Sequence, residues 1–278
     1  MRKIKFTKMV ASGNDFVVVD KLKAYSLKLK AFSKSICDRK YGAGADGLLI
    51  LSQLVLSHGK RSASCGMRIF NADGSEAQMC GNGARCAALY FSCQLSAVSC
   101  QQKIKIETKA GDIHSLVNGN NVKIKLTDPK GLRLNIPIKL NGRTLKVNFI
   151  NTGVPHAVIF VEGLDKIDVD NLGRAIRYHQ VFKPQGANVN FVEVLNNTSI
   201  RIRTYERGVE GETLACGTGS VASGLLTAYN LPLTANIINV HTRGGQILKV
   251  DFQKSGDGFK DVWLEGKAKI VYQGEYYV

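Results

Sequence analysis

Residues 80–83 read Cys-Gly-Asn-Gly and residues 216–219 read Cys-Gly-Thr-Gly, a near copy 216 − 80 = 136 positions further along the chain. Each copy follows an alternating, strand-like run, at residues 67–70 and 200–205, and precedes small and apolar residues that suit a buried helix. The sequence therefore predicts, in each half of the chain, a glycine-rich turn and a helix that begins at the cysteine.

Two further segments recur in the same order. Residues 13–19 (GNDFVVV) are echoed by 153–159 (GVPHAVI), and residues 44–46 (GAD) by 186–188 (GAN), at offsets of 153 − 13 = 140 and 186 − 44 = 142. Three collinear matches at nearly one spacing indicate an internal duplication into two similarly folded halves. The remaining chain is rich in short strands, with a hairpin expected at Asn141-Gly142, so each half is predicted to be mostly β with one helix.

The charge and composition narrow the class of protein. The chain has 278 residues, of which 44% are hydrophobic and 22% charged, and a formal net charge of +16. That charge suggests nucleic acid or another polyanion as a partner. However, many lysines alternate with aliphatic residues, as at 103–106 (KIKI) and 122–126 (VKIKL), which is typical of strands with one solvated face. We therefore expect no nucleic-acid partner, with weak polyanion binding as the alternative.

The cysteines and the hydropathy indicate a compartment. Seven cysteines at scattered spacings do not form the framework of a small secreted domain, and no run reaches the roughly 18 to 20 apolar residues of a membrane helix. A cytoplasmic protein with no membrane partner and no metal is expected. The cysteines outside the repeated motif are expected to be buried structural thiols: Cys37, Cys65, Cys86, Cys93 and Cys100.

The position of Cys80 and Cys216 suggests chemistry. A thiol at a helix N-terminus lies at the positive end of the helix dipole, which lowers its pKa towards the thiolate. Free backbone N–H groups in the same turn form a carboxylate site. If two such turns faced one another, one cysteine could remove an α-proton from one face of an amino acid and the other could return a proton to the opposite face.

Longer motifs carry a family resemblance. Residues 71–76 (NADGSE) leading to 79–86 (MCGNGARC), and residues 205–208 (YERG) leading to 212–219 (ETLACGTG), closely resemble the diaminopimelate epimerase family. The resemblance covers nearly the whole chain. It implies a cofactor-independent enzyme, a homodimer, that interconverts LL- and meso-2,6-diaminopimelate in the synthesis of lysine and peptidoglycan precursors.

The resemblance also implies the fold. It is an α+β fold of two pseudo-symmetric β-rich domains, each a β-barrel-like sheet wrapped around a central helix, with the active site in the cleft between them. The domains are expected at residues 1–118, with 262–278 packing back on them, and at 119–261.

Single residues are carried over by position. Cys80 and Cys216 match the two acid/base cysteines, and His156 and Glu206 are expected to lie against them, respectively, and help to ionise them. The positions that match the family's substrate contacts are Asn14, Asn71, Gly81, Asn82, Asn188, Glu206, Arg207, Gly217 and Thr218.

Two positions depart from the family pattern. Val154 stands where many members carry Asn, and Gly47 where some carry Gln, which bears on selectivity for the distal end of the substrate. The alternatives are therefore a racemase of another amino acid, such as glutamate or proline, and, from a different class, a thiol redox protein that uses Cys80 and Cys216.

Overall fold

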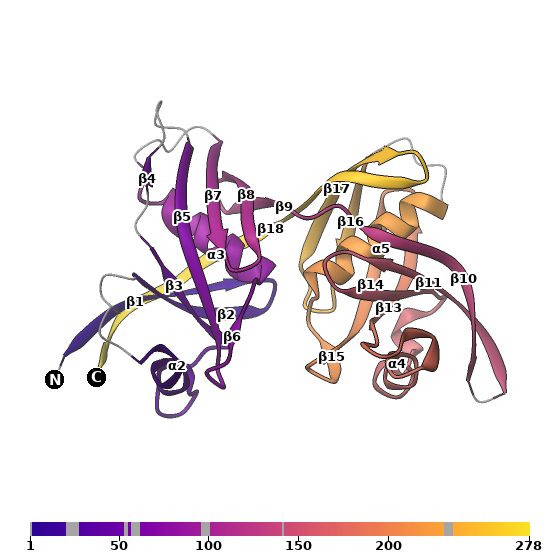
Figure 1. Ribbon diagram of the computed structural model, residues 1–278, viewed down its shortest axis with the longest axis horizontal. Coiled ribbons are helices and arrows are strands. Elements are labelled where there is room, and N and C mark those ends of the chain that lie inside the picture. Colours follow the sequence, from indigo (N-terminus) through magenta and orange to yellow (C-terminus); the bar gives the residue numbers. More distant parts are fainter. Residues whose placement is uncertain are drawn as a thin grey trace. The chain divides into compact units, whose positions relative to one another are not determined.

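The computed structural model describes residues 2–20, 28–52, 55–56, 62–95, 101–140, 142–230 and 236–278. The chain divides into two compact units, Met1–Ile124 with Gly266–Val278, and Lys125–Glu265 (Figure 1). The domain limits expected from the sequence, 118/119 and 261/262, stay a prediction, because compact packing does not show that either half folds alone.

The first unit is a closed β-barrel of eight strands among the described residues. Strands β2 and β3 pair in parallel, as do β5 and β7, and the ring closes because β18 pairs with both β9 and β1. The strands in ring order are β1 (Lys3–Ala11), β2 (Asn14–Asp20), β3 (Gly47–Leu51), β5 (Ser62–Asn71), β7 (Gln102–Thr108), β8 (Gly111–Asn118), β9 (Asn121–Lys125) and β18 (Gly258–Tyr277). The two-residue strands β4 (Val55–Leu56) and β6 (Glu76–Ala77) pair with β5.

The second unit repeats this order of pairs. Strands β12 and β13 are parallel, as are β14 and β16, and the short β15 (Gly211–Thr213) pairs with β14 as β6 does with β5. Its other strands are β10 (Lys130–Leu140), β11 (Arg143–Asn151), β12 (Pro155–Phe160), β13 (Asn188–Asn196), β14 (Ser199–Glu206), β16 (Ile237–His241) and β17 (Ile247–Ser255), which pairs with the first residues of β18. The predicted duplication and α+β class are confirmed. So is the hairpin of β10 and β11, where Leu140 pairs with Arg143, although Asn141 lies outside the described residues.

Each unit contains one largely buried helix that begins directly after a cysteine, as predicted. Helix α3 (Gly81–Ser92) packs on β1, β7 and β8, and helix α5 (Gly217–Asn230) packs on β13, β16 and β17 (Figure 1). Small residues let the surrounding strands approach. A Cβ on Gly224, for example, would lie 3.2 Å from Cβ of Val250 on β17. A helix buried on most sides lacks a polar face, so its alanine- and glycine-rich composition is what the barrel requires.

A second, outer helix in each unit was not predicted. Helices α2 (Leu29–Cys37) and α4 (Val169–Arg177) each have nine residues and lay a few apolar side chains on the barrel, and the short 3₁₀ turns η1 (Leu164–Lys166) and η2 (Gln180–Phe182) flank α4. The prediction of one helix per half was therefore wrong. Two turns give too short a periodic pattern to recognise, and helices of this length depend on tertiary packing.

The other cysteines follow the expectation with one exception. Cys37, Cys65 and Cys86 are buried, whereas Cys93 is exposed because α3 ends there. Cys100 lies outside the described residues. Within the described part of the chain, none of the helices has the length and apolar character needed to cross a membrane.

Gly173 on α4 tests the packing of the outer helix. A Cβ there would lie 2.5 Å from Cβ of Tyr205 on β14. Alanine in a helix interior normally gains about 1 kcal/mol over glycine, but overpacking costs about 1 to 3 kcal/mol. We expect Gly173→Ala to lower the free energy of unfolding in denaturant titrations. The control is Gly258→Ala, where the nearest atom lies 3.8 Å away, and equal stability of both variants would contradict this packing.

Candidate active site

Cys80 is the N-cap of α3. Its backbone is extended, with φ −146° and ψ 121°, its carbonyl accepts the N–H of Ala84 at 2.8 Å, and its Sγ accepts the N–H of Gly83 at 3.5 Å. The side chain is half-buried. The first-turn N–H groups of Gly81 and Asn82 have no acceptor within a helix, so they are available to an anion beside the sulfur.

Cys216 has the same local structure at the start of α5. Its carbonyl accepts the N–H of Ser220 at 2.9 Å, and its Sγ lies 3.6 Å from Oγ1 of Thr218. A Cβ on Gly219 would lie 2.3 Å from Oδ1 of Asn190 and 3.3 Å from Sγ of Cys216. The last glycine of the Cys-Gly-Thr-Gly motif is therefore required by close packing, and the side chain of Cys216 is only 6% exposed.

Burial sets the ionisation of Cys216. Burial and, after it, the nearby charge of Glu206 together raise the pKa of this thiol to about 12, against hydrogen bonds from Thr218 and Gly219 that lower it. Burial shifts a pKa by several units, whereas a helix N-terminus contributes about 1 kcal/mol, less than one pKa unit. The predicted lowering is therefore wrong for Cys216, which is a thiol at neutral pH.

In the first unit, two of the residues predicted to bind substrate are hydrogen-bonded to each other. Nδ2 of Asn82 donates to Oδ1 of Asn14 at 2.6 Å, which places the start of β2 beside the first turn of α3. Asn71, at the end of β5, makes no hydrogen bond to this pair in the described part of the chain; its Nδ2 donates to Oγ of Ser75 at 2.9 Å.

In the second unit, two more of these predicted residues, Asn188 and Arg207, are hydrogen-bonded to each other. Oδ1 of Asn188, the first residue of β13, accepts the backbone N–H of Arg207 at 2.8 Å, and its Nδ2 donates to the carbonyl of Pro155 at 3.3 Å. Nη1 of Arg207 donates to the carbonyl of Gln185 at 3.4 Å. Burial raises the pKa of the neighbouring Glu206 carboxyl.

His156 is fully buried in the second unit, and its tautomer follows from its neighbours. The carbonyl of Ala157 only accepts, so Nδ2 of Asn190, 3.1 Å away, must donate to it; the same nitrogen lies 3.1 Å from Nδ1 of His156. Nδ1 is therefore an acceptor and the proton of the neutral ring is on Nε2. Burial lowers the pKa of His156 to about 3, so the ring is neutral and offers an N–H group rather than a basic nitrogen.

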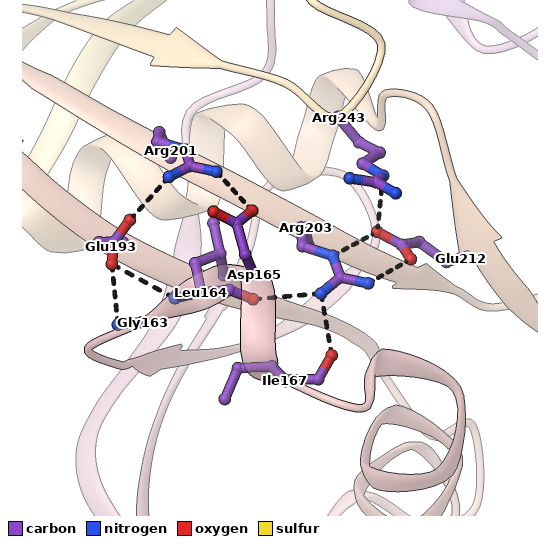
Figure 2. A network of polar contacts seen from close by, with 9 residues as sticks. All are labelled: Gly163, Leu164, Asp165, Ile167, Glu193, Arg201, Arg203, Glu212 and Arg243. Atoms are coloured by element: carbon purple, nitrogen blue, oxygen red, sulfur yellow. Dashed lines mark hydrogen bonds and ion pairs between the residues drawn. The ribbon is translucent and has the colours of Figure 1, made fainter.

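The segment before Cys216 is held by a network that the sequence analysis missed. Figure 2 shows Arg203 of β14 between Glu212 of β15 and two backbone carbonyls. Nε and Nη2 of Arg203 donate to the Glu212 carboxylate, both at 2.7 Å, and Nη1 donates to the carbonyls of Leu164 and Ile167. The sequence signal for this pair was its place: Glu212 is the first residue of the 212–219 motif, and Arg203 lies two residues before the 205–208 motif.

The two departures from the family pattern have different surroundings. A Cβ on Gly47 would lie 2.9 Å from the carbonyl oxygen of Phe70, so β3 and β5 leave little room for a longer side chain there. Val154 lies in the turn between β11 and β12, where its carbonyl accepts the N–H of Thr152 at 3.2 Å. Neither position supplies a polar side chain in this protein.

The described residues contain no group of three or more His, Cys, Asp or Glu side chains placed to hold a metal ion.

The fold is shared with solved structures. A phenazine biosynthesis protein of the PhzF family from Bacillus anthracis matches with a TM-score of 0.70 at 18% identity, and 100% of each chain is covered. A hydroxyproline epimerase from Agrobacterium vitis matches with a TM-score of 0.66 at 16% identity, covering 99% of this chain and 91% of the other. At 18% and 16% identity, these likenesses define the class of fold alone.

Sequence comparison narrows the class to one family. The family model described as diaminopimelate epimerase matches residues 6–130 and 148–271. The diaminopimelate epimerase of Hydrogenobaculum sp. (strain Y04AAS1) is 43% identical over 96% of both chains, and that of Aquifex aeolicus (strain VF5) is 40% identical over 98% of this chain and 97% of its own. The chain belongs to the diaminopimelate epimerase family.

The effect of Glu206 on Cys216 is testable without substrate. Because the carboxylate raises the pKa of the thiol, Glu206→Gln should lower that pKa and speed alkylation of Cys216 at a given pH. The rate is measured against pH by peptide mass spectrometry in wild type and Glu206→Gln, and the exposed Cys93 serves as the internal control. An unchanged pKa would show that Glu206 does not act on the thiol, and a higher pKa would show that Glu206 favours the thiolate; either result would contradict the prediction.

Glu212→Gln tests the network before Cys216. The variant leaves Arg203, whose side chain is 13% exposed, without its bidentate carboxylate, which should cost about 2 kcal/mol of stability and increase the alkylation rate of Cys216. The matched control is Asp165→Asn, at the exposed end of the same network (Figure 2), which should change stability by less than about 0.5 kcal/mol. Equal effects of the two variants would contradict the role given to Glu212.

Proposed function

We propose that this protein interconverts LL- and meso-2,6-diaminopimelate, with Cys80 and Cys216 as the acid/base pair. The observation that carries the proposal is the repeated N-terminal geometry of α3 and α5, each with a thiol beside first-turn N–H groups that have no acceptor within the helix. Membership of the diaminopimelate epimerase family supports the choice of substrate.

In this mechanism one sulfur is a thiolate and the other a thiol. The thiolate takes the α-proton and becomes a thiol, the electron pair moves into the α-carboxylate, and the second thiol returns its proton to the opposite face of the carbon. The reverse reaction exchanges the roles. No cofactor takes part.

The backbone N–H groups of the two helix N-termini hold the α-carboxylate, where the negative charge grows in the transition state. They are those of Gly81, Asn82, Gly217 and Thr218. Donors at that place lower the barrier to proton removal, because their hydrogen bonds strengthen as negative charge develops on the carboxylate.

The polar side chains bind the other charged groups of the substrate. Three amides either accept hydrogen bonds from an ammonium group or donate them to a carboxylate: those of Asn14, Asn71 and Asn188. Arg207 makes a bidentate contact with a carboxylate, and Glu206 forms an ion pair with an ammonium group. Because Val154 has no polar side chain, any hydrogen bond to the distal end of the substrate at this place comes from other residues.

His156 and Glu206 support the two sulfurs in different ways. As a neutral ring with its proton on Nε2, His156 is a hydrogen-bond donor that favours a thiolate at Cys80, and it does not act as a base towards the thiol. Glu206, beside Cys216, favours the protonated thiol that the forward reaction needs. We also propose that the enzyme is a cytoplasmic homodimer that serves lysine and peptidoglycan precursor synthesis.

The test follows the α-proton of LL-diaminopimelate by NMR in deuterated water with reduced protein. Wild type should incorporate deuterium at one α-carbon and form the meso isomer. Because positioned acid/base groups contribute about 10²- to 10⁴-fold, Cys80→Ser and Cys216→Ser should each lose at least about a hundredfold, whereas Cys93→Ser should not.

Other outcomes would contradict the proposal in distinct ways. Exchange with glutamate or proline but not with diaminopimelate would indicate another amino-acid racemase. Turnover that requires cycling of a Cys80–Cys216 disulfide would indicate a thiol redox protein, since epimerisation needs both cysteines reduced.

A further inference from the structure

Arg85 is a buried cation for which the motif analysis assigned no role. It lies in the second turn of α3 and is fully buried, and burial lowers the pKa of its guanidinium to about 10. Nη2 donates to Oγ of Ser12 at 2.7 Å and to Oδ1 of Asn82, while Nε and Nη1 have no partner among the described residues. An apolar residue would fit a barrel core at a lower cost in desolvation, so packing alone does not explain Arg85.

The hydrogen bonds from Arg85 continue in one direction. A guanidinium only donates, so the oxygen of the Asn82 amide must face Arg85 and its nitrogen must point away. That nitrogen donates to Oδ1 of Asn14 at 2.6 Å, and Nδ2 of Asn14 donates to Oδ2 of Asp46 at 3.1 Å.

The far end of this row of hydrogen bonds is also fixed. A carboxylate only accepts, so Asp46 requires the nitrogen of Asn14 to face it. Nη2 of Arg39 donates to the other oxygen of Asp46 at 2.7 Å and to Asp15 at 2.9 Å, which holds the Asp46 carboxylate in place. With a pure donor at one end and a pure acceptor at the other, both amides have one allowed orientation.

We propose that Arg85 is a positioning residue that fixes the amide orientations of Asn82 and Asn14, so that each presents its second N–H group to the substrate. After the recorded bonds, one hydrogen on Nδ2 of Asn82 and one on Nδ2 of Asn14 remain. Two convergent N–H groups beside the first turn of α3 suit a carboxylate. The choice of that substrate group rests on the proposed function.

Three substitutions of Arg85 separate orientation from packing. Lysine keeps a donor-only cation, glutamine both donates and accepts, and methionine fills the space without polar atoms. Loss of a charge-assisted bond costs about tenfold or more, so KM for diaminopimelate should rise about tenfold in Arg85→Met and Arg85→Gln and less in Arg85→Lys. The midpoint of thermal unfolding should follow a different order, with Arg85→Met at least as stable as Arg85→Lys, because a buried charge is removed.

Two further variants serve as checks. Ser12→Ala removes the other partner of Nη2 but leaves the amide chain intact, so its KM should stay within about twofold of wild type. Asp46→Asn replaces the acceptor-only end at a partly exposed site, so it should raise KM as Arg85→Met does even if a buried substitution prevents folding. If Arg85 served only packing, Arg85→Met would have a lower KM than Arg85→Lys. That result, or an unchanged KM in Asp46→Asn, would overturn the proposal.

A readout without substrate keeps this result apart from the proposed function. Hydrogen exchange of the Asn14 and Asn82 side-chain amides, followed by NMR, should be slow in wild type and Arg85→Lys and at least about tenfold faster in Arg85→Met. If wild type does not turn over diaminopimelate but shows this pattern, the proposed function fails and the orientation role stands. Equal exchange in wild type and Arg85→Met would overturn it whatever the substrate.

Discussion

A helix enclosed in a β-barrel has its backbone groups satisfied everywhere except at its ends, and this constraint shapes both halves of the protein. The barrel needs small residues along the helix, because each strand passes close to it, as β17 does at Gly224. The first-turn N–H groups stay unsatisfied inside the helix. Cys80 and Cys216 stand at that one polar end, where their carbonyls accept the first helical N–H and their sulfurs lie beside the remaining donors.

The same constraint works against ionisation. A sulfur at the start of an enclosed helix gains from the dipole but loses water, and at Cys216, which is 6% exposed, the loss of water is the larger effect. Half-exposed Cys80 keeps more of its hydration. Two copies of one motif can therefore hold sulfurs in different protonation states, which is what a reaction needs that removes a proton with one group and returns it with another.

The repeated motifs were sufficient to predict the duplication and the start of both buried helices, because spacing and glycine context are local features, and the family resemblance added the α+β class. The outer helices α2 and α4 were not predicted, because two turns show too little of the helical hydrophobic periodicity. Arg85 and the Arg203–Glu212 pair escaped for another reason. Their importance depends on burial and on partners such as Ser12 and Leu164, which lie 85 − 12 = 73 and 203 − 164 = 39 positions away. Sequence spacing carries no information about such contacts.

The two halves share a backbone pattern but not their charges. The offset of 136 that relates Cys80 to Cys216 relates the buried Arg85 to Val221, so the matching position of the second half carries no cation. Burial lowers the pKa of Arg85, and the electrostatic interactions with Cys86 and then Cys80 offset part of this lowering, because an anionic sulfur nearby would stabilise the cation. In the second half the neighbouring charge is the carboxylate of Glu206, which favours a protonated Cys216. In the proposed reaction, charges of opposite sign therefore give the two cysteines different surroundings before substrate binds, an asymmetry that the duplicated backbone alone would not provide.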